Sequence, residues 1–469
     1  MWGFRVGVSS GIITPPVGVP MAGFLRMDVS HGVHDDLYAK ILLVEEADRR
    51  VAIITLDILG LNRDEMCILR EIVSEETGVE PSDVMIGCTH THSGPSVKPN
   101  PASSLPVRRQ KQLIDLWLKN LRLRVREISR EASRNLREAR VKYGRSLVTG
   151  LSYNRRLPIP EGVCSLIMDT GSMRDALRSL YKTWGMPPKL IEERAKPAIP
   201  TGTIDPDLTV IRFEGLRGDP IAILTNFSCH PVTLGPANLL ISADYPGYFV
   251  RFVEEVEGVT VLFTQGASGD VRPYYSERSF REAERIGVAL ASVTLRMTGM
   301  MHPLPSGIDV KVASEALKVQ FREMPTPEEA GRMISEKEKS LKEALEEAVK
   351  TGDFSEVRRL SDELTILRDI AEEEVSSFPI DEVCELQVMA FGDLVLAAVP
   401  GELFTELGLE VKRRAKPRRV VISTLTNGWI GYIITREAYE EGGYESRSAL
   451  KPGFGELIVD RLVSLIGRV

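Results

Sequence analysis

Two histidines lie one residue apart where an apolar stretch of the chain ends. Residues 85–97 read MIGCTHTHSGPSV, and this segment holds His90 and His92, two of only six histidines in the chain. Because side chains at positions i and i+2 of a strand point to the same face, we expect the two imidazoles to lie side by side. Neutral imidazole is a common ligand for zinc and similar metals. On its own, the segment fits a metal site and a polar loop equally well.

Further candidate metal ligands follow two other apolar segments. His230 comes after LTNFSC and before a proline, and Glu402 follows AAVPG and opens a predicted helix. A single histidine in such a place is more often structural, and a carboxylate at a helix start is stabilised by the helix dipole without any metal. Two histidine sites at strand ends are nevertheless unusual in a chain with so few histidines.

Two other segments carry weaker signals. The segment TQGASGDVRPYY (264–275) places a glycine-rich turn after a strand, where backbone N–H groups can bind an anion. It lacks the lysine of a nucleotide-binding P-loop, and the chain has no GxSxG motif of a serine hydrolase. The segment 428–446 contains three tyrosines, whose usual role in such a run is packing: Tyr432, Tyr439 and Tyr444.

The elements that position these residues are predicted from the spacing of apolar residues. A strand over 49–61, a helix over 63–78 and a strand over 83–94 form a βαβ unit, in which Asp57 and the histidine pair lie at the carboxyl ends of strands. The other predicted elements are a long helix over 106–136, strands over 207–214, 220–229 and 259–264, helices over 246–256 and 278–297, and strands over 385–402.

Two regions differ from the rest of the chain. Residues 155–205 are proline-rich, which predicts loop or lid structure. Residues 326–376 are highly charged and broken by TGD at 351–353, which predicts a solvent-exposed helical hairpin. Since no clear linker divides the chain, we predict one large α/β domain over 1–469, with mixed sheets, flanking helices and the hairpin as an insertion.

Composition and charge are those of a soluble globular protein. The 469 residues are 43% hydrophobic and 27% charged, and the net charge of −7 leaves no basic surplus for nucleic acid. No apolar run reaches the roughly 20 residues that span a bilayer, and the N-terminus does not resemble a signal peptide. The five cysteines show no CxxC spacing, which argues against disulfides and thiolate zinc sites. We expect a cytoplasmic enzyme of unknown oligomeric state.

The order of several short motifs resembles that of the neutral (non-lysosomal) ceramidases. The motifs are GIITPPVGVPMAGF, GVHDDLYAKILLVEE, VAIITLDILGL, THTHSGP, NRR, HPV, GD, PGE and GYIITREAYEEGGYE. They cover most of the chain outside residues 323–380, and THTHSGP is the most specific of them. We expect the chain to correspond to the family's catalytic domain, without its C-terminal immunoglobulin-like domain.

This resemblance implies a zinc-dependent amidase that holds one Zn²⁺ ion. The family's metal ligands correspond to His90, His230, Glu402 and Tyr432. Its other active-site residues correspond to His92, which would handle protons, to Arg155, and to Tyr444, which would contact the scissile carbonyl. Zinc activates water and polarises an amide carbonyl, and a tyrosine hydroxyl and a guanidinium stabilise the oxyanion. The same ligands also suit nickel, cobalt or iron.

One position departs from the family's pattern. Where the family has a serine after GD, this chain has Arg272, which would suit an anionic or strongly polar substrate. We therefore predict hydrolysis of an amide (N-acyl) bond in a small-molecule or lipid-like substrate that need not be ceramide. One alternative is a metal-dependent esterase, lactonase or phosphoesterase in which Arg272 and Arg155 bind an anionic group. The other is a non-catalytic binding protein stabilised by its metal.

Overall fold

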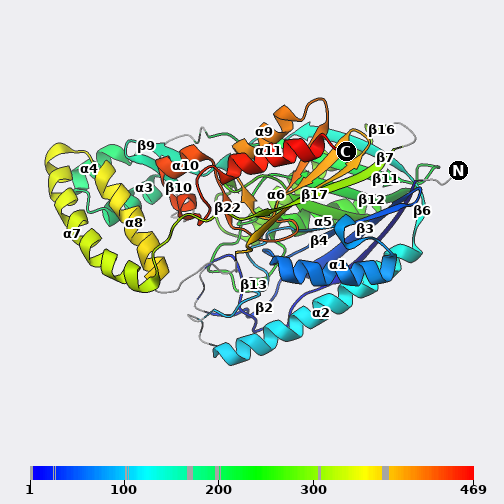
Figure 1. Ribbon diagram of the computed structural model, residues 1–469, viewed down its shortest axis with the longest axis horizontal. Helices are drawn as coiled ribbons and strands as arrows, with labels where there is room; N and C mark the ends of the chain where they lie inside the picture. Colours follow the sequence, from blue (N-terminus) through cyan, green and yellow to red (C-terminus); the bar gives the residue numbers. More distant parts are fainter. Residues whose placement is uncertain are drawn as a thin grey trace.

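The computed structural model shows three sheets of four or five strands, with helices packed outside them (Figure 1). The described residues also form four two-stranded sheets. The structure describes residues 4–24, 26, 28–100, 103, 105–165, 173–195, 200, 202–304, 308–371 and 380–469. The predicted α/β class, with mixed sheets and flanking helices, is confirmed.

The first sheet is built from the N-terminal part of the chain, in the order β5-β4-β3-β1-β6. Its strands are β1 (Arg5–Ile12), β3 (Tyr38–Glu46), β4 (Arg49–Leu56), β5 (Val84–Cys88) and β6 (Arg137–Glu138). Helix α1 (Arg63–Thr77) connects the parallel strands β4 and β5, which confirms the predicted βαβ unit. The long helix predicted next is α2 (Val107–Arg134), which packs on α1 and β1.

Alternate side chains of β3 enter two different cores, because successive residues of a strand point to opposite faces. Ile41 and Leu43 pack with Trp117 of α2 on the outer face of the sheet. Leu42 and Val44 face inward, into a core that all three sheets share. A strand buried on both faces needs the continuous apolar run that the sequence ILLV provides.

The other two sheets are each covered by their own helices. The second sheet has the order β14-β12-β11-β7-β16 and lies under α5 and α6; the third has the order β17-β18-β19-β21 and lies under α9 and α11. The elements of the second are β7 (Arg140–Leu147), β11 (Asp207–Glu214), β12 (Pro220–Phe227), β14 (Thr260–Gln265), β16 (His302–Pro303), α5 (Asp244–Glu257) and α6 (Phe280–Thr298). Those of the third are β17 (Val310–Lys318), β18 (Val383–Phe391), β19 (Leu394–Ala398), β21 (Arg419–Ser423), α9 (Thr405–Arg414) and α11 (Phe454–Ile466).

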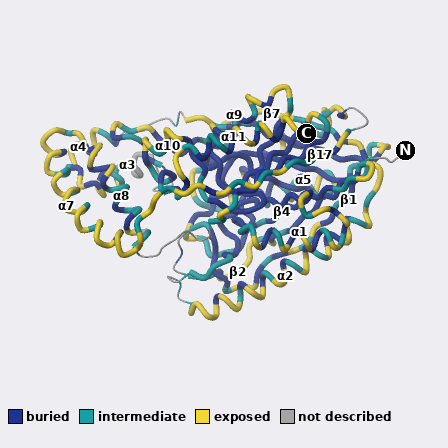
Figure 2. Tube along the Cα trace, in the orientation of Figure 1, coloured by how far each residue is buried: buried dark blue, intermediate teal, exposed yellow. Residues whose placement is uncertain are grey.

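The inner faces of the three sheets meet in one apolar core. Phe213 of the second sheet and Phe391 of the third lie edge to face, with ring centroids 6.5 Å apart, and Leu42 of the first sheet joins the same cluster. Figure 2 shows this interior as buried, whereas the outer helices carry exposed residues. The shared core holds the sheets against one another, and this fixes the loops at their ends.

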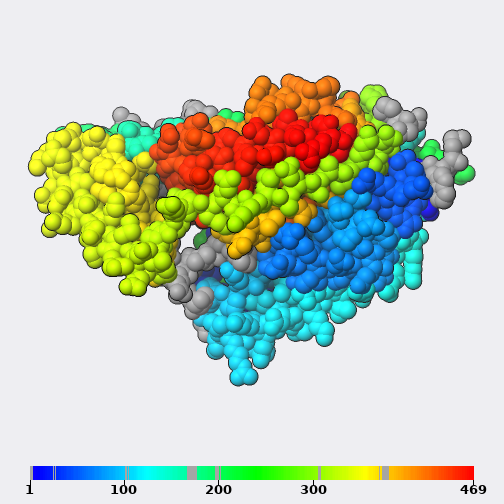
Figure 3. Space-filling model, viewed as in Figure 1, coloured from blue at the N-terminus to red at the C-terminus, as the bar shows by residue number. Residues whose placement is uncertain are grey.

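A separate group of helices lies at one end of the molecule (Figures 1 and 3). The hairpin predicted over 326–376 is confirmed as α7 (Pro327–Thr351) and α8 (Ser355–Ala371); residues 372–376 lie outside the described residues. A capping box of Thr326 and Glu329 begins α7, and Gly352, with φ of 79°, ends it.

The prediction of irregular structure over 155–205 is wrong for most of its described part. Residues 166–172, 196–199 and 201 lie outside the described residues. The rest contains β9 (Arg156–Ile159), β10 (Gly162–Ser165), α3 (Met173–Thr183) and α4 (Pro188–Arg194). Trp184 and its neighbours pack against Phe354 in a core of their own. Pro188 lies at the start of α4, a helix position that tolerates proline, so the prolines do not prevent helix formation here.

Membrane-spanning helices and disulfides are both missing from the described residues. None of the helices there is long and apolar enough to cross a bilayer. All five cysteines are described and free, and four of them are buried.

A buried carboxylate begins α5 and makes stability depend on pH. Asp244 is 1% exposed, and burial raises its pKa to about 6, although backbone N–H groups of Thr233, Leu234 and Tyr245 donate to it. Because this pKa lies above the value of about 3.9 in an unfolded chain, the stability that the residue contributes is complete below about pH 4 and is lost as the pH rises through 6. We expect the free energy of unfolding of the wild type, relative to Asp244→Asn, to fall by about 3 kcal/mol between pH 4 and pH 8. Denaturant titrations of both proteins measure this difference, and a constant value would contradict it.

Candidate metal centre

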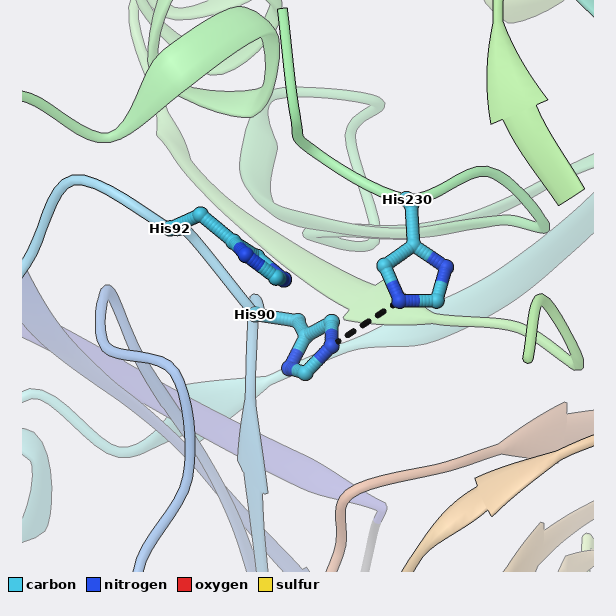
Figure 4. A group of neighbouring side chains, drawn as sticks. All are labelled: His90, His92 and His230. Carbon is cyan, nitrogen blue, oxygen red and sulfur yellow. Dashed lines mark hydrogen bonds between the residues drawn. The ribbon is translucent and has the colours of Figure 1, made fainter. Parts of the chain in front are cut away.

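Three side chains from distant parts of the chain converge at one buried point. The Nε2 atoms of His90 and His230 are 3.2 Å apart. Glu402 Oε2 is 2.8 Å from His230 Nε2 and 3.5 Å from His90 Nε2. The exposed fractions of the three residues are 1%, 0% and 6%. Figure 4 shows the two imidazoles turned towards each other, each supplied by a different segment.

Backbone carbonyls orient both imidazoles. His90 Nδ1 is 2.8 Å from the Leu59 carbonyl oxygen, and His230 Nδ1 is 2.6 Å from that of Ser268. A carbonyl oxygen only accepts hydrogen bonds, so each Nδ1 carries a proton and donates it. In neutral imidazoles the two Nε2 atoms therefore present lone pairs to each other and to the Glu402 carboxylate. This is the arrangement by which outer contacts orient metal-binding histidines.

The three ligand atoms fit a divalent metal ion. Ligand atoms about 2.0–2.1 Å from a tetrahedral zinc ion lie roughly 3.3–3.4 Å from one another, which is close to the observed distances of 2.8–3.5 Å. Without a cation, three acceptors would face one another in a buried site, which is unfavourable. His90, His230 and Glu402 thus suit a metal ion, as the resemblance of the motifs implied.

The protonation states also suit metal binding. Burial lowers the pKa of His230 to about 4, and the Glu402 carboxylate only partly offsets this effect. Burial alone would raise the pKa of Glu402, but His90 and His230 bring it well below its usual range. At neutral pH the site therefore presents a neutral His230 imidazole and an ionised Glu402 carboxylate, which are the forms that bind metal.

The two histidines of the THTH motif come together for a reason other than strand periodicity. Strand β5 ends at Cys88, and His90 has φ of 70°, in the left-handed region that non-glycine residues rarely adopt. Its backbone N–H donates to the Ile58 carbonyl. The rings of His90 and His92 lie edge to face, with centroids 4.9 Å apart. The predicted proximity is confirmed, whereas the predicted strand geometry is wrong.

Glu402 is held by a short parallel strand pair. It lies in β20 (Glu402–Leu403), opposite Tyr432 of β22 (Tyr432–Ile433), and α9 begins only at Thr405. The expectation that Glu402 opens a helix is therefore wrong, and the helix dipole does not account for its place. The pairing brings Tyr432 beside Glu402. Tyr439, by contrast, packs in the core of the third sheet and donates to the Leu450 carbonyl.

Arg155 links the Tyr432 hydroxyl to the buried carboxylate of Glu445. Its Nη2 donates to the Tyr432 hydroxyl at 3.1 Å, and its Nε donates to Glu445 Oε1 at 2.7 Å. Burial and the Glu402 charge raise the pKa of Tyr432 well above its usual value, so the phenol keeps its proton in the absence of a cation. A cation beside the hydroxyl would have the opposite effect. Metal ligation by Tyr432 stays a prediction.

Glu445 is a central residue of the site that the sequence did not reveal. Its side chain is fully buried, and its second oxygen accepts hydrogen bonds from Arg156 Nη1 at 3.0 Å and Ser165 Oγ at 2.6 Å. Burial raises its pKa, but the arginines outweigh this effect and the pKa lies below its usual value. Glu445 follows Tyr444 directly, and the Tyr444 ring lies edge to face with that of Tyr432, 5.8 Å away. The sequence signal that could have identified Glu445 was its position in the GGYE motif, directly after Tyr444.

His92 lies beside the converging ligands. Its ring centroid is 4.8 Å from that of Phe24 and 5.7 Å from that of His230. A nitrogen atom of His92 and one each of His90 and His230 lie within 4.8 Å of one another. Neither ring nitrogen of His92 has a hydrogen-bond partner among the described residues. Burial and the two other imidazoles bring its pKa well below its usual value, so the ring is neutral at pH 7.

The glycine-rich turn predicted within 264–275 lies over residues 266–270 and supports the site through carbonyl oxygens. The Ser268 carbonyl accepts from His230, and the Gly269 carbonyl accepts from Arg155 Nη2. Asp270 is buried and accepts from Asn154 at 2.6 Å and from the Thr405 hydroxyl at 2.9 Å. The turn thus joins β8 (Ser152–Asn154) to the start of α9.

Arg272 lies close to this turn, on β15 (Val271–Pro273). It is 4% exposed and pairs with Tyr153 across the two strands. Its guanidinium carbon lies 5.0 Å from the centroid of the Tyr275 ring and 6.0 Å from that of Tyr153. The preceding residue, Val271, accepts a hydrogen bond from the His230 backbone N–H. The predicted contact of Arg272 with a substrate stays a prediction.

Comparisons with known proteins show similarity to a neutral ceramidase in sequence and in fold. The neutral ceramidase of Pseudomonas aeruginosa is 22% identical over 523 aligned positions, covering 99% of this chain and 72% of that protein. A crystal structure of that ceramidase superposes with a TM-score of 0.69 at 20% identity, over all of this chain and 75% of the other. A ceramidase complexed with C2 gives the same TM-score at 19% identity, over 76% of that chain. No protein-family model matches the chain. The chain is therefore a distant relative of the neutral ceramidases and has their fold, as its motifs predicted.

Proposed function

We propose that the protein is a metal-dependent hydrolase that cleaves the amide bond of an N-acyl substrate with one Zn²⁺ ion. The observation that carries the proposal is the buried set of His90, His230 and Glu402, whose ligand atoms lie within 3.5 Å of one another. The similarity to a neutral ceramidase supports amide hydrolysis. His90, His230, Glu402 and Tyr432 would hold the zinc ion, which would supply an activated water and polarise the amide carbonyl.

The surrounding side chains of the chain have distinct parts in this reaction. Burial raises the pKa of Tyr444, so its hydroxyl is protonated and donates to the carbonyl oxygen as negative charge develops there. Arg155 holds the Tyr432 hydroxyl and adds a fixed positive charge. His92, neutral and without a hydrogen-bond partner among the described residues, accepts a proton from the attacking water and returns it to the leaving amine.

A substrate panel tests the proposal. It contains N-acyl amides, esters and phosphoesters, each with a neutral and an anionic member, because Arg272 is buried where ceramidases have a serine. We expect turnover of N-acyl amides, and Tyr444→Phe should lower kcat by about 100- to 1000-fold, the loss typical of one oxyanion donor. Metal content of this variant should stay unchanged.

Other outcomes of the panel favour the alternatives. Turnover of esters or phosphoesters alone would replace the amidase by another metal-dependent hydrolase. A drop in melting temperature on chelation, without turnover of any member of the panel, would indicate a metal-stabilised binding protein.

A further inference from the structure

We propose that the hairpin α7–α8 positions the active-site tyrosine Tyr444, and that Arg358 of α8 is the positioning residue. The hairpin belongs to the part of the chain, residues 323–380, that lacks the motifs shared with neutral ceramidases. The role of Tyr444 in catalysis rests on the function proposed above, whereas the contacts of Arg358 do not.

Arg358 reaches from the hairpin to the segment that precedes Tyr444. It is 8% exposed, and its Nη1 donates to the Glu441 carbonyl at 2.6 Å and to Asp362 Oδ2 at 3.3 Å. Asp362 lies one helical turn further along α8, and its Oδ2 in turn accepts from the Gly443 backbone N–H at 3.5 Å. The two side chains therefore contact the chain on both sides of Gly442.

Two glycines from different elements leave the space that the guanidinium occupies. A Cβ atom at Gly442 would lie 2.0 Å from Arg358 Nη1, and one at Gly162 would lie 2.8 Å from its Cζ. Both glycines also have positive φ, 76° and 130°. The hairpin β9–β10 and the end of α10 (Arg436–Glu441) thus form a hollow that the Arg358 guanidinium occupies.

The segment that precedes Tyr444 needs such contacts because its two glycines restrict the backbone conformation very little. Gly442 and Gly443 are consecutive and have φ of 76° and 92°, and glycine loses more conformational freedom on ordering than any other residue. Tyr444 and Glu445 follow at once. A shift of the glycine pair would therefore move the tyrosine ring and the carboxylate together.

Hydrogen bonds connect the segment around Tyr444 to the candidate metal centre, so a shift of this segment would also move residues there. The Tyr444 backbone N–H donates to Ser165 Oγ, which donates to Glu445, which accepts from Arg155, which donates to the Tyr432 hydroxyl. These contacts form one continuous path from α8 to the residue opposite Glu402.

The matched variants are Arg358→Ala and Arg359→Ala. Arg359 is the next residue of α8, and it pairs with Glu356 and Glu363 on the exposed side of the helix. For Arg358→Ala we expect kcat to fall by about 10- to 100-fold, the loss typical of changes in residues that support a site, with KM changed less than about threefold and metal content unchanged. Arg359→Ala should behave like the wild type.

Chemical rescue separates positioning from general destabilisation. Millimolar guanidinium can enter the hollow and should restore part of the activity of Arg358→Ala, whereas methylammonium should not, and Arg358→Lys should stay impaired. If Arg358→Ala keeps the wild-type kcat, or loses metal to the same extent as activity, the proposal is wrong.

Hydrogen exchange tests the same proposal without any substrate. Amides of residues 441–447 should exchange faster in Arg358→Ala than in Arg359→Ala, while those of α7 stay protected in both. Equal exchange in residues 441–447 would overturn the positioning role even if no hydrolysed substrate were known. Faster exchange without detectable turnover would support positioning and count against the proposed function alone.

Discussion

Replacement of His230 by alanine is expected to remove the metal ion. His230 supplies one of three buried ligand atoms that converge at the site, so the variant keeps two of them, on His90 and Glu402. Loss of a direct ligand should weaken metal binding by more than about 100-fold, the upper limit for outer contacts of metal ligands. Metal content of the purified protein, measured by mass spectrometry, should fall from one ion per chain to nearly none. His90→Ala should behave in the same way.

Two other histidines provide the controls. His302 is exposed on β16, and His302→Ala should leave both metal content and activity unchanged. His92→Ala should keep the metal and lose activity, because His92 adjoins the ligands but is predicted to handle protons. Full metal content in His90→Ala and His230→Ala would show that the ion binds elsewhere.

Glu445→Gln is expected to cost about 3–5 kcal/mol of stability. The carboxylate is fully buried between the guanidinium groups of Arg155 and Arg156, which are themselves almost buried. The neutral amide keeps the shape of the side chain but removes the buried counter-charge that Arg155 and Arg156 share, and breaking a buried pair from one side has a cost of this size. Denaturant titration of the chelated proteins measures the difference without a contribution from metal binding.

Glu441→Gln is the matched control for this prediction. Its carboxylate also pairs with Arg156, at 3.0 Å, but its side chain is 52% exposed. Exposed pairs contribute at most about 1 kcal/mol, so we expect a change no larger than that. Equal losses in the two variants would mean that Glu445 does not neutralise the buried arginines.

Local patterns in the sequence predicted most of the elements correctly. Apolar periodicity located the βαβ unit and the long helix α2, because a packed strand or helix shows its buried face in its own residues. The hairpin α7–α8 was equally predictable, since its capping box at Thr326 and its glycine at 352 are local signals. The order of the motifs predicted the relationship to neutral ceramidases and which histidines and carboxylate converge.

Long-range contacts decided the features that the sequence predicted wrongly or missed. Helices α3 and α4 lie in a proline-rich stretch and are held by packing against α7 and α8. His90 sits in a left-handed conformation, so the pairing of the THTH histidines follows from a loop and not from a strand.

The sequence by itself therefore determined most of the elements and the identity of the candidate metal ligands. Only the tertiary structure decided what holds those side chains in place: Glu445 meets Arg155 across 290 residues, and Arg358 meets Glu441 across 83. The spacing of charged residues along the chain does not indicate which residues they pair with. Such a pair also becomes strong only in the low dielectric environment of the folded core.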